Sequence, residues 1–409
     1  MSIHKFTLKN GVRILVAPNN NVRSAAIGIT CRAGSRHERD NEGGITHFIE
    51  HMLFKGTKSR NAKQIAEEIE GRGGMLNAFT DKEQTTYYCR VLSDDAPVAV
   101  DVLSDMLLNS LLDSEELGRE KGVILEEIKR GEDDHEGHVH DLHIERRWGN
   151  HPLGRPIIGT KESVSSFQSG DLKAYIHRRY LGGNVIISCA GNLDPKSFFE
   201  LASEKLSDLE SGEDNPTLEA PQVTVDRKEL TREVEQVHFC IGGDSVSVYS
   251  PDIYTMAVLD AVLGGGMSSR LFQEIRERRG LAYSVSSYNL SYSAAGMFTI
   301  YGGTGPQTWE QVQDVIRAEW TKVILEGLRE GELEKVKRQM AGNIVLSLES
   351  MNSQMMRMTK NELVHGRDIP IDETLQKINA VTETQVRDMA ASVFADGKVS
   401  VTAIGPFGG

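Results

Sequence analysis

The sequence predicts an α+β protein made of two related α/β-sandwich-like domains that arose by internal duplication. Three observations support this fold class. The chain has 409 residues, which is long for one hydrophobic core, and many of its expected strands are joined as hairpins. Its two halves also end alike, because at 171–192 and at 384–406 a helix leads through a turn to an apolar strand and a glycine. We expect the domains to cover 1–215 and 216–409, since the polar stretch 207–225, with its glycine and prolines, resembles a linker.

The first element is expected to be a hairpin with an Asn10-Gly11 turn, and a short amphipathic helix should follow within 43–56. Helical spacing places His47 and His51 one turn apart on one face, with Glu50 at its border. The buried side of this helix should consist of Ile45, Phe48, Ile49, Met52 and Leu53. Two imidazoles on one apolar anchor can therefore reach a single metal ion.

The order His-x-x-Glu-His inverts the His-Glu-x-x-His motif, and both motifs present two histidines and a carboxylate to one metal. The pattern indicates a zinc hydrolase with Glu50 as the base. Histidine is scarce, with 12 residues in the chain, so a chance match is uncommon. The alternative is an amphipathic helix with surface histidines.

The stretch Met75–Thr80 is expected to be a strand at the edge of a sheet. A Gly73-Gly74 break precedes it, and an Asp81-Lys82 turn leads to a second strand at 85–91. An exposed strand edge can bind an extended peptide through main-chain hydrogen bonds. An ordinary core hairpin explains the same pattern.

A catalytic zinc ion usually has three protein ligands, and the best candidates for the third lie in an expected helix at 113–132. Glu120 and Glu127 share one side of this helix, whereas Glu126 points about 100 degrees away. One carboxylate could bind the metal while the other holds a histidine ring by its second nitrogen. Spacing alone leaves these two roles open.

A second group of potential ligands follows at 135–143, where His135, His138, His140 and His143 lie among acidic residues. An acidic, histidine-rich segment at the start of a helix is usually solvated surface, and we favour that interpretation over a metal site.

The second half contains Arg276 and Tyr283 in the stretch 272–283. From the residues alone, a solvated helix end followed by a strand tyrosine explains the pair, because other arginines crowd the same region. The helix expected at 254–263 corresponds to the histidine-bearing helix of the first half, but it carries no ligands.

Over its whole length the chain resembles the pitrilysin-type zinc peptidases, in particular the short-chain branch similar to the catalytic subunit of mitochondrial processing peptidase. Members carry His-x-x-Glu-His and, downstream, a phrase like Glu-Arg-x-Val-Ile-Leu-x-Glu. The matching phrases are His47–His51, Glu120–Glu127, Gly74–Thr80, Leu153-Gly154 before Ile157–Thr160, and Gly264–Leu271.

The resemblance implies that Glu127 is the third zinc ligand and that Glu120 is the outer carboxylate, with one Zn²⁺ per chain. It also implies that Arg276 and Tyr283 contact the substrate carbonyl or the tetrahedral intermediate, and that Asn77, Ala78 and Phe79 lie against the peptide. In this family two related halves form a bowl, and two bowls close on the substrate like a clam shell. The short branch does so as a dimer, so we expect a homodimer in which Arg276 and Tyr283 complete the partner's site.

Composition limits the partners. A formal net charge of −13 argues against nucleic acid and favours basic peptides as substrates. The four cysteines are scattered, so we expect buried free thiols in a reducing compartment. No apolar run of membrane-spanning length and no signal-peptide core is present, so we expect a cytoplasmic protein with no membrane partner. The competing function is that of a non-catalytic structural or partner subunit of the same fold.

Overall fold

The structure is a computed structural model that describes residues 3–214, 216–217 and 219–407. The chain forms two compact units, one from 1–129, 155–217 and 347–369, the other from 130–154, 218–346 and 370–409. These units differ from the division at 215/216 that the sequence predicts, because two helical segments are exchanged. The segment 130–154 packs with the second unit, and 347–369 packs with the first.

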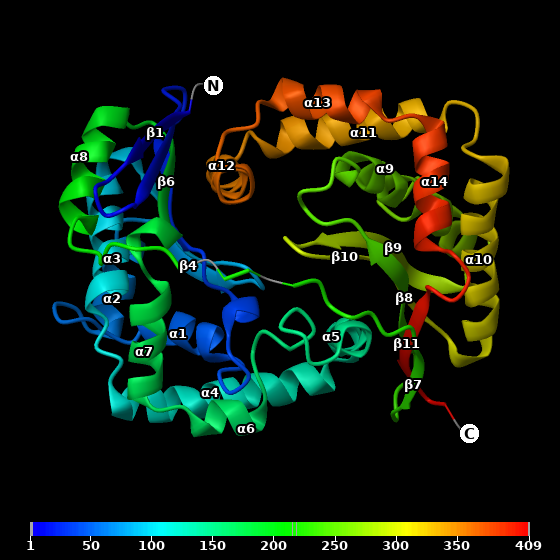
Figure 1. Cartoon of the computed structure of the whole chain (residues 1–409), viewed down its shortest axis with the longest axis horizontal. Coiled ribbons are helices and arrows are strands. Elements are labelled where there is room, and N and C mark those ends of the chain that lie inside the picture. Colours follow the sequence, from blue (N-terminus) through cyan, green and yellow to red (C-terminus); the bar gives the residue numbers. More distant parts are fainter. Residues whose placement is uncertain (1–2, 215, 218, 408–409) are drawn as a thin grey trace. The chain divides into compact units, whose positions relative to one another are not determined.

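The first unit is built on a six-stranded sheet in the order β1-β2-β6-β3-β5-β4 (Figure 1). Its strands are β1 (His4–Thr7), β2 (Arg13–Pro18), β3 (Ser24–Cys31), β4 (Met75–Thr80), β5 (Thr85–Leu92) and β6 (Val185–Gly191). Neighbouring strands are antiparallel except β2 and β6, which are parallel. The hairpins at Asn10-Gly11 and at 81–84 are confirmed, and β4 is an edge strand, as predicted.

Helices cover both faces of this sheet. They are α1 (Ile45–Leu53), α2 (Ala62–Glu70), α3 (Ala96–Asn109), α4 (Ser114–Asp133), α6 (Lys161–Ser166), α7 (Ser169–Arg179), α8 (Pro195–Leu206) and α12 (Met351–His365), with 3₁₀ turns η1 (Ser35–His37), η2 (Ser93–Asp95) and η3 (Gly182–Asn184). The main core lies between the sheet and the helices that include α1, α3 and α8. On the other face α12 packs on β3 and β6 through Met351, Met355 and Met358, which explains why this late segment belongs to the first unit.

The second unit repeats the first in topology. Its sheet order is β7-β11-β8-β10-β9, with β7 and β11 parallel and the other neighbours antiparallel. The strands are β7 (Arg227–Thr231), β8 (Val237–Ser245), β9 (Ala282–Ser291), β10 (Gly296–Thr304) and β11 (Ser400–Gly405). The same order and directions occur in β2-β6-β3-β5-β4, which supports the predicted internal duplication.

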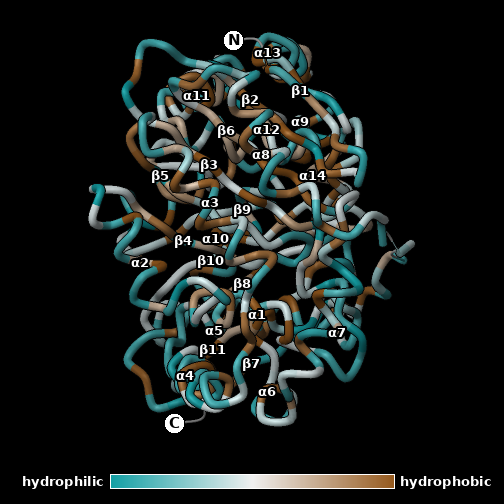
Figure 2. Tube along the Cα trace, turned by 90° about the vertical axis from the view of Figure 1, so that its left-hand side faces the viewer, coloured by the Kyte–Doolittle hydropathy of each residue, from teal (hydrophilic) through white to brown (hydrophobic). Residues whose placement is uncertain are grey.

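The helices of the second unit are α5 (His135–Trp148), α9 (Ile253–Leu263), α10 (Trp309–Glu326), α11 (Glu332–Ser347), α13 (Ile371–Ala380) and α14 (Glu383–Val393), with a π-helix η4 (Phe272–Glu277) and a 3₁₀ turn η5 (Pro306–Thr308). The helix α9, the counterpart of α1, has no histidine, as predicted. Figure 2 shows both hydrophilic and hydrophobic residues at α4 of the first unit, and the buried side of this helix consists of Leu117, Glu120, Ile124 and Ile128.

The interpretation of the 135–143 tract as solvated surface is wrong for two of its histidines. The helix α5 packs on β8 and β11, so His143 is completely buried and its Nδ1 lies 3.0 Å from the hydroxyl of Thr402. His140 is partly buried, with its Nδ1 2.6 Å from the Tyr288 hydroxyl. These rings belong to the packing of the second unit.

All four cysteines are buried and free, as predicted. Within the described ranges, the helices are too short or too polar to cross a membrane.

Candidate metal centre

The helix α1 begins where two stretches of backbone meet. Its N-cap, Gly44, has a φ of 91°, and a Cβ added there would lie 2.6 Å from the carbonyl oxygen of Ile158. Gly159 approaches Gly43 equally closely, since a Cβ on Gly159 would lie 2.5 Å from the Gly43 carbonyl oxygen. Glycine is therefore required on both sides of this contact, which positions the histidine-bearing helix.

A buried carboxylate fixes the first turn of α1. Glu38 accepts the backbone N–H of Gly44 and of Thr46, each at 2.9 Å, and so satisfies donors that the helix itself leaves unpaired. Burial raises the pKa of Glu38 to about 7, although both hydrogen bonds oppose this shift. The hydroxyl of Thr46 also lies 3.0 Å from that of Tyr175 on α7, which ties α1 to its neighbour.

The three predicted zinc ligands lie together. His47 and His51 on α1 and Glu127 on α4 present ligand atoms that all lie within 4.8 Å of one another. The distance from His51 Nε2 to Glu127 Oε2 is 3.6 Å. Two atoms that each bind one tetrahedral zinc ion at about 2.1 Å lie about 3.4 Å apart, so this spacing already matches a shared ion. Among the described residues, His47, His51 and Glu127 are the one group of three or more potential ligands whose ligand atoms lie this close together.

The carboxylate of Glu120 orients one of the rings. Its Oε2 lies 3.1 Å from His51 Nδ1, and its Oε1 lies 2.6 Å from the ammonium of Lys55. Because Nδ1 is occupied in this way, Nε2 is the nitrogen of His51 that faces Glu127. Glu127 thus lies among the candidate ligand atoms, whereas Glu120 contacts the other nitrogen of the His51 ring.

The His47 ring matches a metal ligand in its electrostatics. Burial, reinforced by the neighbouring His51, lowers its pKa to about 4, so the ring is neutral near pH 7, which is the form that binds metal. Its Nδ1 is buried and has no hydrogen-bond partner among the described residues. A ring with an unsatisfied nitrogen, a second oriented imidazole and a carboxylate together fit Zn²⁺.

Glu50 lies beside these ligands, on α1. Burial raises its pKa, while a hydrogen bond from the Thr80 hydroxyl to its Oε2 opposes that shift. Thr80 is the last residue of β4, the strand that also carries Asn77, Ala78 and Phe79. Asn77 is exposed, and Ala78 and Phe79 are half-buried, so the edge remains accessible beside Glu50.

Arg276 and Tyr283 lie in the second unit, outside the unit that holds the histidines. The guanidinium of Arg276 is 5.1 Å from the ring centre of Tyr283 and 4.8 Å from that of Phe272. Tyr283 is 79% exposed and is the second residue of β9, an edge strand in the position that β4 has in the first unit. The structure therefore brings this pair together on an exposed edge.

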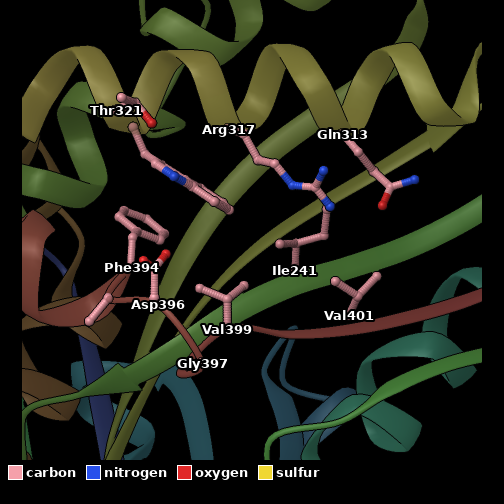
Figure 3. Close-up of a pocket in the computed structure, with 11 residues that line it drawn as sticks. Ile241, Gln313, Arg317, Thr321, Phe394, Asp396, Gly397, Val399 and Val401 are labelled. Carbon is pink, nitrogen blue, oxygen red and sulfur yellow. The ribbon is translucent and has the colours of Figure 1, made fainter.

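A pocket of the second unit contains none of the predicted site residues (Figure 3). It lies between α10 and β11 and is lined by Arg317, Phe394, Val401 and other residues. Its aromatic wall is a stacked pair, Trp320 and Phe394, with ring centres 4.5 Å apart. The candidate ligand atoms of His47, His51 and Glu127 belong to the first unit and lie outside this pocket.

Sequence reasoning missed three residues of this site. Lys55 and Thr80 stand in stretches that the motifs include, but no pattern reveals which carboxylate each contacts. Glu38 lies outside the motif and carries no signal in the sequence, because its role depends on folding back onto the start of α1.

Comparison with known proteins identifies the family. Residues 13–161 match the model of insulinase (peptidase family M16), and residues 166–340 match that of the peptidase M16 inactive domain. A Bacillus subtilis protein named uncharacterized zinc protease YmxG is 44% identical, with 96% of each chain covered. The chain belongs to peptidase family M16.

Other similarities agree with this membership. A Streptomyces coelicolor protein, named uncharacterized zinc protease SCO5738, is 39% identical over 99% of this chain and 90% of its own. The fold is that of a Helicobacter pylori protease, with a TM-score of 0.91 at 21% identity, 98% of this chain and 99% of that one being covered. A Pseudomonas fluorescens structure titled peptidase M16 inactive domain gives a TM-score of 0.92 at 21% identity, covering 100% of this chain and 99% of that one. Two M16-type domains account for the two similar sheets.

Proposed function

We propose that this chain is a zinc-dependent endopeptidase that hydrolyses extended peptides, with one zinc ion per chain and Glu50 as the general base. The observation that carries the proposal is the convergence of His47, His51 and Glu127, from two helices, with ligand atoms within 4.8 Å of one another. The zinc protease names of the M16 relatives support the same activity.

Zinc at this site would acidify a water molecule and polarise the scissile carbonyl. Glu50 is on the same helix as two of the ligands but is not one of them, so its carboxylate is available to take the water's proton. The same group can return the proton to the leaving amine. Glu120 holds the His51 ring, and Lys55 balances the charge of Glu120.

The substrate is proposed to bind as an added strand along β4. This strand pairs with β5 through six residue pairs and ends the sheet, so an extended peptide can add along its other side. The N–H of Ala78 donates to Asn77 Oδ1 at 2.8 Å, a local bond that a bound peptide would replace. Such binding depends on the extension of the peptide more than on its side chains. We therefore expect loose sequence specificity.

We also propose that the active form is a homodimer in which Arg276 and Tyr283 of one chain complete the site of the other. The exposed Tyr283 phenol and the Arg276 guanidinium are suited to stabilise a developing oxyanion. A mixed dimer of Glu50→Gln and Tyr283→Phe chains should retain one intact site. Mixtures with no more activity than either parent would contradict completion across the interface.

The proposed function is tested with a quenched peptide substrate. Cleavage should stop on addition of a chelator and return with zinc. Glu50→Gln should keep one zinc per chain while cleavage falls by about 10²- to 10⁴-fold, whereas His51→Ala and Glu127→Ala should lose both. Glu126→Gln, which changes an exposed carboxylate next to Glu127, is the matched control and should behave like the wild type.

The competing role, a non-catalytic subunit, makes the opposite prediction. Such a subunit would need neither Glu50 nor the zinc ligands for its function. A wild-type chain that binds zinc but cleaves no peptide from a diverse mixture would favour that role.

A further inference from the structure

The general base contacts the strand proposed to bind substrate. The Thr80 hydroxyl lies 2.5 Å from Glu50 Oε2, and Thr80 is the last residue of β4. The side chain of Glu50, on α1, therefore contacts the edge strand of the sheet. No role for Thr80 follows from the zinc motif itself.

Neighbouring contacts determine the direction of this hydrogen bond. Thr80 pairs with Thr85 in the β4–β5 register, and the Thr85 hydroxyl donates to the carbonyl oxygen of Ala33 at 2.7 Å. The Thr85 hydroxyl oxygen is 3.5 Å from the Thr80 hydroxyl oxygen, so its contact with Thr80 is much weaker than its hydrogen bond to Ala33. A hydroxyl has one proton, and Thr80 gives it to the carboxylate of Glu50.

We propose that Thr80 is a positioning residue for Glu50: its hydroxyl holds Oε2 and leaves Oε1 as the oxygen that takes the proton from water. This inference rests on the proposed peptidase function. Because Thr80 belongs to β4, it aligns the base with the substrate strand as well as with the metal ligands on α1. A carboxylate without this bond would rotate about its last side-chain torsion, which is a broad and weakly restricted one.

Two substitutions separate hydrogen bonding from packing. Thr80→Val keeps the branched shape that a strand favours and removes the donor, whereas Thr80→Ser keeps the donor and removes a methyl group. If the hydroxyl positions Glu50, kcat should fall about 10- to 100-fold in Thr80→Val, with KM and zinc content unchanged, and Thr80→Ser should stay within about threefold of the wild type. If Thr80 acts through packing alone, kcat should fall more in Thr80→Ser than in Thr80→Val.

Two further variants complete the test. Thr86→Val is the matched control, because Thr86 on the adjacent strand contacts the Thr30 hydroxyl at 2.9 Å, away from Glu50; it should lower stability without lowering kcat. In a Glu50→Gln background, Thr80→Val should cause little further loss, since both changes disable the same group. A full additional loss in the double variant would overturn the inference.

The same series separates this inference from the function on which it rests. A wild-type chain without chelator-sensitive cleavage refutes the proposed function. An active wild type together with an equally active Thr80→Val chain refutes the role of Thr80 alone.

Discussion

The contact between Glu120 and His51 can be tested through zinc affinity. Glu120 is 4% exposed, and its two oxygens contact His51 Nδ1 at 3.1 Å and Lys55 at 2.6 Å. Glu120→Gln keeps the shape of the side chain but removes its charge. The imidazole then loses a charged acceptor, and the ammonium of Lys55 loses its ion-pair partner.

Two independent scales give the magnitude of the effect. A hydrogen bond to a charged group contributes about 1.5–3 kcal/mol when it is well formed. Removing an outer partner of a metal-binding histidine typically weakens metal binding by about 10- to 100-fold, which corresponds to about 1.4–2.8 kcal/mol. The Lys55 side chain is 31% exposed, so water compensates part of the lost ion pair. We therefore expect zinc to bind about 10- to 100-fold more weakly.

The assay is competition for zinc between the protein and a chromogenic chelator. Glu115→Gln on the same helix is the matched control, because that side chain is 79% exposed and pairs with Arg119 at the surface. Its zinc affinity should equal that of the wild type. If Glu120→Gln also binds zinc with wild-type affinity, the carboxylate does not orient His51 in the way described.

Three further predictions concern stability and substrate. Burial lowers the pKa of His143 to about 3, so this ring stays neutral in the folded chain and takes up a proton only on unfolding below pH 6.5. Stability is therefore unaffected by this ring above pH 6.5 and falls as the pH decreases toward 3, and the loss reaches about 2 kcal/mol at pH 5. In denaturant unfolding, acidification to pH 5 should destabilise His143→Gln by about 2 kcal/mol less than the wild type. Gly44→Ala should lower the thermal midpoint and weaken zinc binding, since a left-handed non-glycine residue costs about 1–2 kcal/mol and its Cβ would clash, whereas Gly118→Ala, with open space around it, should do neither. Basic peptides should be cleaved faster than acidic ones at low salt and lose that advantage at high salt; equal rates throughout would exclude attraction by the net charge of −13.

Local patterns predict part of this site well. The spacing of His47 and His51 determines their common face as soon as α1 forms, and the glycines around Gly44 mark where the helix begins. Assigning Glu127 required the family resemblance, because the choice between Glu127 and Glu120 depends on how α4 packs against α1.

The remaining features depend on contacts between distant segments. His143 was expected at the surface, but it is buried because α5 packs on β11, more than 250 residues away. The methionines of α12 likewise cover the sheet of the first unit, and no linker composition indicates that exchange. Thr80 and Glu50 meet across 30 residues through a hydroxyl whose partner only the folded chain defines.

A crystal structure of the zinc-loaded protein, with anomalous diffraction at the zinc edge, will show whether His47, His51 and Glu127 share one zinc ion. We predict one strong peak per chain, about 2.0–2.2 Å from nitrogens of His47 and His51 and from an oxygen of Glu127. A peak at the 135–143 histidines with none at His47 and His51 would contradict the account.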